Sequence, residues 1–284
     1  MDPNPELTHL YSCSRWANLD PNEVIANYVQ IGEETCKQLR KTIHVEDLPY
    51  DQSDDPNSPT KVDIWGEVKD DLVIFIHGGY WQEGTRKVVS PVAVNLLKRG
   101  IAMAAVGYEY ASPSNPISQV VKQLVAATET QFLLSKHPQA KRITLAGHSA
   151  GAQLAFKVAT CLQHPRIQKL ALFAGVFDLS ELPFCEIGTA IGLTPEEAKK
   201  SSCHACEINT VNIRVQILIA LKDSPKLIEQ NRAMVKAMKS LGIALDAHEF
   251  VNCDHFDIVQ GLRENSEEQT QKFLAFLCDD KVPS

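Results

Sequence analysis

A serine stands between two glycines in the stretch Gly147-His148-Ser149-Ala150-Gly151. An apolar run precedes it, as in a strand buried on both faces, and apolar side chains at helical spacing follow it. This pattern is typical of a serine on a sharp strand-to-helix turn, where a Cβ two residues before or after the serine would clash. Such a turn lifts the hydroxyl clear of the backbone and aims amide groups at developing negative charge. The stretch therefore predicts Ser149 as a nucleophile.

The pair Gly78-Gly79 is a second candidate, because it follows His77 at the end of the apolar run 72–76. Two glycines let a loop turn its N–H groups into a pocket, where they stabilise an oxyanion without reorganisation. Gly78 and Gly79, with the amide of Ala150, are therefore predicted to form an oxyanion hole. The alternative for the pair is a simple tight turn, and His77 is expected to hold the loop by hydrogen bonding.

A serine nucleophile needs a base, usually a histidine oriented by a carboxylate. His255 is the best placed of the nine histidines, because it follows the last predicted strand in a short polar turn. His248 lies inside that strand and is interpreted as structural or exposed. The side chain of His148 should point away from the hydroxyl, so it is interpreted as a packing residue.

Two carboxylates are candidates for orienting the base. Asp223 follows the strand after an irregular segment, and Asp178 ends the strand before that segment. The chain order serine, aspartate, histidine favours Asp223. Asp254 and Asp257 flank the histidine too closely to reach round its ring and are interpreted as turn residues.

Strands and helices that alternate along the chain are expected to position these groups. Apolar runs predict strands at about 62–65, 72–76, 101–110, directly before Ser149, 169–178, 215–221 and 244–250. Amphipathic segments predict helices at about 91–99, 117–134, directly after Ser149, 226–241 and 267–278. This alternation predicts one α/β domain, 1–284, with a mostly parallel sheet covered on both faces. Functional groups collect at the carboxyl ends of such strands, so the candidates should share one edge.

Two segments lie outside this alternation. Residues 1 to about 45 are predicted to be mostly helical and to pack across the outside without contributing chemistry. Residues about 180–212 are longer, mixed and rich in turns, and are predicted to form a cap-like helical insertion. The polar stretch 51–59 is predicted to be a loop.

Composition excludes several functional classes. The chain has 284 residues and a formal net charge of −7 with no basic run, so no nucleic-acid partner is expected. No apolar run is long enough to cross a membrane, and the polar amino terminus does not resemble a signal peptide. Eight scattered cysteines are expected to be reduced thiols of a cytoplasmic protein. The pair Cys203 and Cys206 lacks a second ligand pair, so no metal is expected.

The motifs together resemble those of the kynurenine formamidases (arylformamidases), a family of α/β-hydrolases. The resemblance lies in His77-Gly78-Gly79-Tyr80-Trp81-Gln82, Gly147-His148-Ser149-Ala150-Gly151-Ala152-Gln153-Leu154, Gly175-Val176-Phe177-Asp178-Leu179, Asp223-Ser224 and Asp254-His255-Phe256-Asp257-Ile258. It covers residues 60 to 260, and the Tyr80-Trp81 continuation separates this family from other esterases with His-Gly-Gly. Gln153 is a departure, because histidine is expected there in animal members.

The resemblance implies hydrolysis of N-formyl-L-kynurenine to L-kynurenine and formate, in tryptophan breakdown. It implies that Ser149, Asp223 and His255 act as a triad without a cofactor or metal. Tyr80 and Trp81 would wall the aromatic ring, or else pack within the loop. The family also suggests a cytoplasmic homodimer, with nuclear presence possible.

Two other functions compete with this interpretation. A general carboxylesterase of the hormone-sensitive-lipase type would carry the same triad, with only the Tyr80-Trp81 loop and the insertion against it. A catalytically inactive homologue that binds a small ligand is the remote alternative, and the complete triad argues against it.

Overall fold

Eight strands form one sheet in the computed structural model of the protein, which describes residues 2–51, 55, 58–133, 137–208 and 212–279. Their order across the sheet is β1-β2-β4-β3-β5-β6-β7-β8. Strand β2 runs antiparallel to both of its neighbours, β1 and β4, and the other neighbouring pairs are parallel. The strands are β1 (Val45–Pro49), β2 (Lys61–Trp65), β3 (Asp71–Ile76), β4 (Ala102–Val106), β5 (Arg142–His148), β6 (Ile167–Phe173), β7 (Arg214–Lys222) and β8 (Leu245–Asp254).

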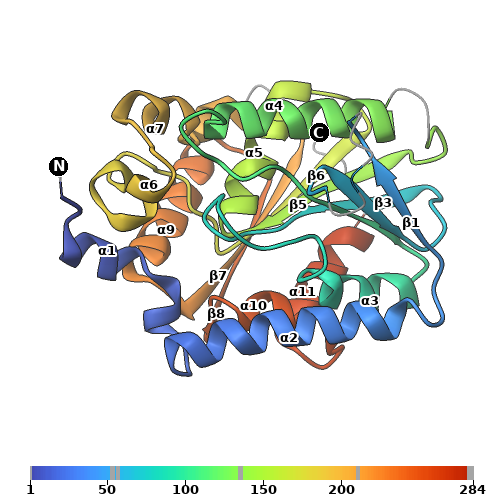
Figure 1. Ribbon diagram of the computed structural model, residues 1–284. Coiled ribbons are helices and arrows are strands. Elements are labelled where there is room, and N and C mark those ends of the chain that lie inside the picture. Colours follow the sequence, from blue (N-terminus) through green and yellow to red (C-terminus); the bar gives the residue numbers. More distant parts are fainter. Residues whose placement is uncertain (1, 52–54, 56–57, 134–136, 209–211, 280–284) are drawn as a thin grey trace.

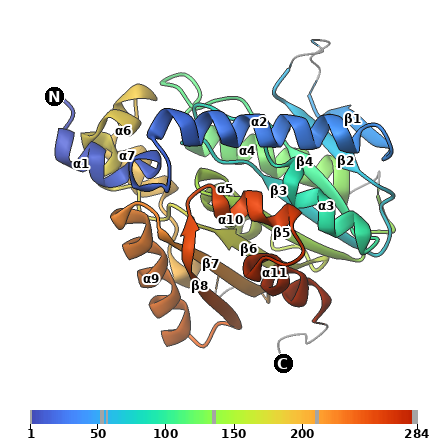
Figure 2. The same ribbon diagram turned by 90° about the horizontal axis from the view of Figure 1, so that it is seen from below.

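Helices cover both faces of this sheet (Figure 1). On one face lie α4 (Ile117–Thr128), α5 (Ala150–Leu162) and α9 (Pro225–Ser240), and on the other lie α2 (Pro21–Leu39), α3 (Ser90–Lys98), α10 (Asp257–Gln260) and α11 (Glu268–Cys278). Figure 2 shows α2 running across the second face. The three-layer α/β architecture predicted from the apolar runs is therefore confirmed.

The two faces arise from the alternation of side chains along each strand. In β3, Leu72, Ile74 and Ile76 pack with α4 and α5 residues, whereas Val73 and Phe75 pack with α3 residues. Both sets are buried to at least 99%. A strand with two buried faces has no polar alternation, which is why the sequence shows continuous apolar runs.

Several predicted strand ends differ from the observed ones. β4 stops at Val106 rather than reaching residue 110, and β6 stops at Phe173, where Ala174 adopts a left-handed φ of 45°. β8 continues to Asp254, four residues past its predicted end, so the polar residues 252–254 belong to the strand and not to a turn. Along β8 most side chains are partly exposed, and apolar content therefore underestimates its length. For the same reason the half-exposed strand β1 was not predicted at all.

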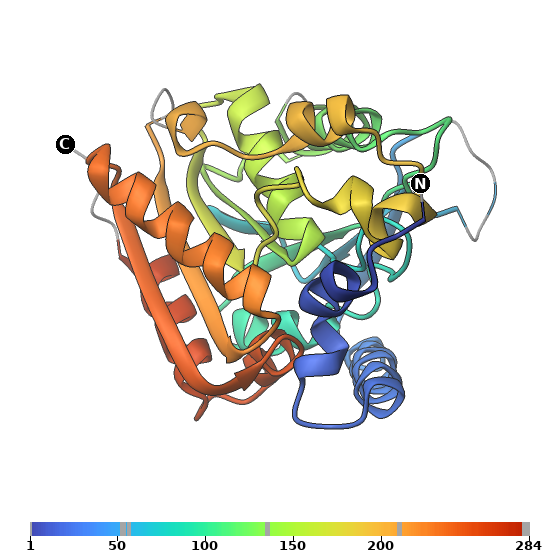
Figure 3. The same cartoon turned by 90° about the vertical axis from the view of Figure 1, so that its left-hand side faces the viewer.

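The insertion predicted at about 180–212 forms short helices over its described part: η3 (Leu182–Phe184), α6 (Glu186–Ala190), α7 (Pro195–Ser201) and α8 (Ala205–Ile208). The amino-terminal segment adds α1 (Pro5–Tyr11) and η1 (Cys13–Trp16) before α2. Figure 3 shows α1 beside α6. A backbone hydrogen bond connects the two segments, because the Asn4 amide donates to the Phe184 carbonyl at 2.7 Å. Helix α4 ends at Thr128 and continues as a π-helical turn, η2 (Glu129–Leu133), while residue 134 lies outside the described ranges.

Candidate active site

Ser149 occupies the turn between β5 and α5, with φ 57° and ψ −123°. A Cβ on Gly147 would lie 2.1 Å from the Gly151 carbonyl oxygen, and a Cβ on Gly151 would lie 2.2 Å from the Ile76 carbonyl oxygen. Neither position therefore tolerates a side chain, as the spacing of the motif predicts. Among the described residues, the Ser149 hydroxyl has no hydrogen-bond partner, so no internal hydrogen bond fixes the direction of its O–H.

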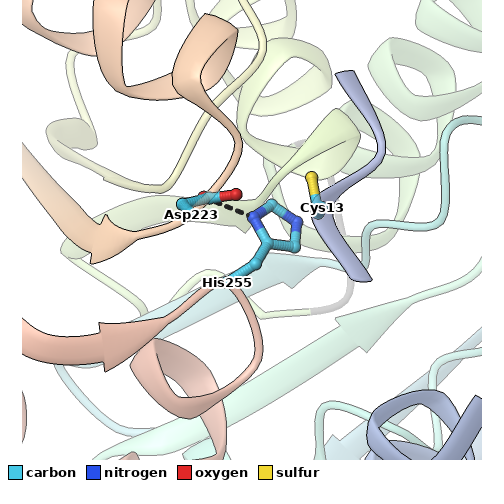
Figure 4. A group of neighbouring side chains, drawn as sticks. All are labelled: Cys13, Asp223 and His255. Atoms are coloured by element: carbon cyan, nitrogen blue, oxygen red, sulfur yellow. Dashed lines mark hydrogen bonds and ion pairs between the residues drawn. The ribbon is translucent and has the colours of Figure 1, made fainter. Parts of the chain in front are cut away.

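Asp223 and His255 meet at the carboxyl ends of β7 and β8. Lys222 at the end of β7 pairs with Asp254 at the end of β8, next to an irregularity in the pairing of the two strands. Asp223 and His255 are the residues that directly follow β7 and β8, so they lie side by side. The distance from His255 Nδ1 to Asp223 Oδ2 is 2.6 Å, and both side chains are more than 95% buried (Figure 4). The Ser224 amide donates to Asp223 Oδ1 at 2.5 Å. This arrangement leaves Nε2 of His255 free to accept a proton.

His148 has a more specific position than that of a packing residue. Its Nε2 lies 2.7 Å from the His255 carbonyl oxygen, and the two rings are 4.5 Å apart. Burial lowers the pKa of His148 well below its usual value, so the ring is neutral and must donate its one N–H from Nε2. His148 therefore holds the backbone of the predicted base in place.

The loop Gly78-Gly79 is held by aromatic groups behind it. His77 Nδ1 lies 2.8 Å from the Gly78 carbonyl oxygen, and the His77 ring stacks on Tyr108 at 4.3 Å. Burial lowers the pKa of His77 to about 4, so its neutral ring donates to that carbonyl. Within the described residues, the amides of Gly78, Gly79 and Ala150 donate to no other backbone group. These three N–H groups remain available to a ligand.

The two aromatic residues predicted to wall the substrate have different positions. Tyr80 lines the cavity beside the site. Trp81 is fully buried instead, and its indole Nε1 donates to Gln153 Oε1 at 2.9 Å. Gln153 in turn donates to the Ser201 carbonyl at 2.8 Å. Trp81 therefore has the alternative packing role, and the departing residue Gln153 connects the glycine loop, the nucleophile helix and the insertion.

A cavity of about 170 Å³ adjoins the site and is lined by Gly78, Gly79 and His255. Its remaining walls are mostly apolar and come from Ile25, Tyr28, Val29, Val88, Ile187 and Phe256. Glu83 also lines it, and burial raises the pKa of that carboxyl. This mixture of an apolar body with a few polar groups is typical of a small-molecule pocket.

The amino-terminal segment, which was expected only to pack across the outside of the domain, also reaches the site. Ser12, Cys13 and Ser14 line the same cavity. Cys13 Sγ lies 2.7 Å from the Tyr80 hydroxyl, and the Ser224 hydroxyl donates to the Leu10 carbonyl at 2.6 Å. The sequence gave no indication of the contact between Cys13 and Tyr80, since Cys13 is a single cysteine in a polar stretch.

The other candidates fall outside this cluster. Asp178 is exposed, and its side chain accepts the Ser180 amide at 2.9 Å, so it does not contact His255. Asp254, the last residue of β8, accepts the amides of Phe256 and Asp257 in the turn that follows the strand. His248 pairs with Asp246 at 2.8 Å.

Cys203 and Cys206 have different surroundings. Cys203 is buried beside the Gln153 carbonyl, at 3.7 Å, whereas Cys206 is exposed. All eight cysteines are free thiols. No described helix is long and apolar enough to cross a membrane.

Comparison with known proteins gives a consistent picture. The α/β hydrolase fold family matches residues 73–257, about two thirds of the chain. The kynurenine formamidase of Salmo salar is 27% identical, and that of Danio rerio is 26% identical, each over 96% of both chains. At this coverage, both alignments extend well beyond the motifs.

A solved structure supports the fold independently. A putative thioesterase from Silicibacter sp. tm1040 superposes with a TM-score of 0.76 at 20% identity, covering 95% of this chain and 100% of the other. The chain therefore belongs to the α/β-hydrolase family as a hydrolase, and its resemblance to the kynurenine formamidases within that family extends over nearly its whole length.

Proposed function

We propose that the protein is a serine hydrolase that cleaves N-formyl-L-kynurenine to L-kynurenine and formate. The observation that carries the mechanism is the buried 2.6 Å contact between His255 and Asp223, beside the turn that presents Ser149. The substrate is proposed from the kynurenine formamidases of Salmo salar and Danio rerio, which align with nearly all of this chain.

In this reaction His255 Nε2 takes the proton of the Ser149 hydroxyl as Oγ attacks the formyl carbon. The N–H groups of Gly78, Gly79 and Ala150 stabilise the oxyanion. His255 then returns the proton to the anilide nitrogen, the C–N bond breaks, and L-kynurenine leaves. Water, deprotonated by His255, then attacks the formyl ester. His255 passes that proton to Ser149 Oγ as the ester C–O bond breaks and formate leaves. Asp223 accepts the Nδ1–H of His255 throughout and stabilises the imidazolium.

The cavity supports an aromatic substrate. The aromatic residues Tyr80, Tyr28 and Phe256 line it, together with aliphatic residues such as Ile25 and Val88. An arylamide also suits the chemistry, because an aryl amine leaves more readily than an alkyl amine. The small formyl group needs little space near Ser149, whose surroundings are closely packed by Gly78 and His148.

Replacement of the nucleophile tests the mechanism. We expect Ser149→Ala to lower kcat for N-formyl-L-kynurenine by about 10⁴–10⁶-fold, because no other group forms the acyl intermediate. The exposed Ser240 offers a control, and Ser240→Ala should retain the wild-type rate. Circular dichroism should show both variants folded. A Ser149→Ala protein that keeps substantial turnover would rule out the serine mechanism.

The substrate is tested separately, by comparing kcat/KM of the wild type for N-formyl-L-kynurenine and for p-nitrophenyl acetate. We expect the formamide to be preferred. A preference for the ester would instead identify a general carboxylesterase with the same catalytic residues.

A further inference from the structure

We propose that Cys13, Asp223 and His255 form an inhibitory binding site for Zn²⁺ and similar soft divalent cations. One possible ligand atom from each of the three residues lies within 4.8 Å of the other two, and all three side chains are buried. Figure 4 shows them converging from the amino-terminal segment and from the ends of β7 and β8. The inference depends on this geometry and not on the identity of the substrate.

The donor set matches zinc chemistry. A thiolate, an imidazole and a carboxylate are the three ligand types that Zn²⁺ takes in proteins, and thiolate disfavours Mg²⁺ and Ca²⁺. With bonds of about 2.0–2.3 Å, tetrahedral ligands stand about 3.5 Å apart. The three side chains therefore need only small movements to enclose an ion. Three protein ligands leave the fourth position for water.

The ligands are already held by their neighbours. The Tyr80 hydroxyl contacts Cys13 Sγ at 2.7 Å, and the same hydroxyl also donates to the Tyr11 carbonyl. The Ser224 amide fixes the second oxygen of Asp223. Outer contacts of this kind orient metal ligands and raise affinity. The ion also has an entry path, because Cys13 and His255 both line the cavity beside the site.

Binding exchanges protons for the ion. The Cys13 thiol is neutral, because burial and the neighbouring Asp223 carboxylate raise its pKa well above the usual value. A divalent cation would displace the thiol proton and offset the repulsion between thiolate and carboxylate. His255 and Asp223 would then be held as ligands and could not serve Ser149. The expected result is reversible inhibition by zinc that a chelator relieves.

The test measures inhibition and metal binding on the same proteins. Hydrolysis of p-nitrophenyl acetate is followed with increasing Zn²⁺, relative to the zinc-free rate of each protein. We expect Cys13→Ser to raise the half-inhibitory zinc concentration by about tenfold or more, since it removes the softest ligand. The exposed Cys206 provides the matched control, and Cys206→Ser should keep the wild-type zinc sensitivity. Mg²⁺ should not inhibit the wild type.

A spectroscopic measurement does not depend on activity. Co²⁺ bound to the wild type should show a thiolate-to-cobalt charge-transfer band that is absent from Cys13→Ser and retained in Cys206→Ser. Cys13→Ala, checked by circular dichroism, provides a second variant in case the serine variant does not fold. Equal zinc sensitivity of wild type and Cys13→Ser, or a cobalt spectrum without the band, would overturn the proposal. An enzyme that fails to hydrolyse N-formyl-L-kynurenine would refute the proposed substrate and leave this result unchanged.

Discussion

At the scale of single residues, two aspartates, each at the end of a predicted strand, have different surroundings. Asp223 is 4% exposed, lies 2.6 Å from His255, and accepts a backbone amide with its other oxygen. Asp178 is exposed, its side chain accepts the Ser180 amide, and its backbone bonds to the side chain of Gln230. A carboxylate orients a histidine only by direct contact, so the two should differ sharply in their effect on catalysis.

We expect Asp223→Asn to lower kcat by about 10³–10⁴-fold, because an amide favours the wrong tautomer of His255. Asp178→Asn is the matched control and should leave kcat close to the wild-type value. Steady-state kinetics with N-formyl-L-kynurenine or p-nitrophenyl acetate measure both variants. A larger loss in Asp178→Asn would contradict the assignment of the carboxylate.

At the scale of elements, Gln153 connects three parts of the site. Its side chain accepts from Trp81 in the glycine loop and donates to Ser201 at the end of α7, and it is fully buried in α5. Neither partner has access to water if this side chain is lost, because Trp81 is 0% and Ser201 2% exposed. Buried polar groups without partners are costly.

Gln153→Leu should therefore lower the free energy of unfolding by about 2–4 kcal/mol, since two buried groups lose their partner. Gln153→His should lower the free energy of unfolding much less, because a neutral imidazole offers one acceptor for Trp81 and one donor for the Ser201 carbonyl. Urea denaturation measures both. The exposed Gln119 serves as control, and Gln119→Leu should change stability by less than about 0.5 kcal/mol. Similar losses in Gln153→Leu and Gln119→Leu would show that the connection does not stabilise the protein.

At the scale of the whole molecule, the buried histidines make stability depend on pH. Burial lowers the pKa of His77 from 6.5 to about 4 in the folded protein. Below pH 6.5 the unfolded chain therefore binds a proton that the folded protein does not. The stabilisation is complete above pH 6.5 and is lost as the pH falls towards 4.

We expect His77 to account for a loss of about 2–3 kcal/mol in the free energy of unfolding between pH 6.5 and 4.5. His77→Asn keeps a donor near the Gly78 carbonyl but cannot titrate, so its stability should fall less over the same range. Urea denaturation at the two pH values gives the difference. Parallel losses in wild type and variant would mean that His77 is not the group responsible.

Local patterns in the sequence were sufficient for the strands that are buried on both faces and for the turn around Ser149. Such strands appear in the sequence as apolar runs. Gly147 marks a close backbone contact inside the turn, and Gly151 marks the close approach of the turn to the end of β3. The carboxyl-end rule then brought Gly78, Ser149, Asp223 and His255 to one edge, and the choice of Asp223 over Asp178 agrees with the observed contact. The half-exposed strand β1 was not predicted, and β8 was predicted four residues too short, because side chains of mixed polarity form no apolar run.

Only the tertiary structure decided which distant segments complete the site. Cys13 contacts Tyr80 and lies beside Asp223 and His255, yet more than 200 residues separate it from the latter two. Trp81 and Tyr80 are neighbours in the chain, but one is buried against Gln153 and the other lines the cavity. Local sequence determines the conformation of a turn or strand, because the contacts are between near neighbours. Contacts between remote segments depend on how whole elements pack, and no spacing along the chain records that packing.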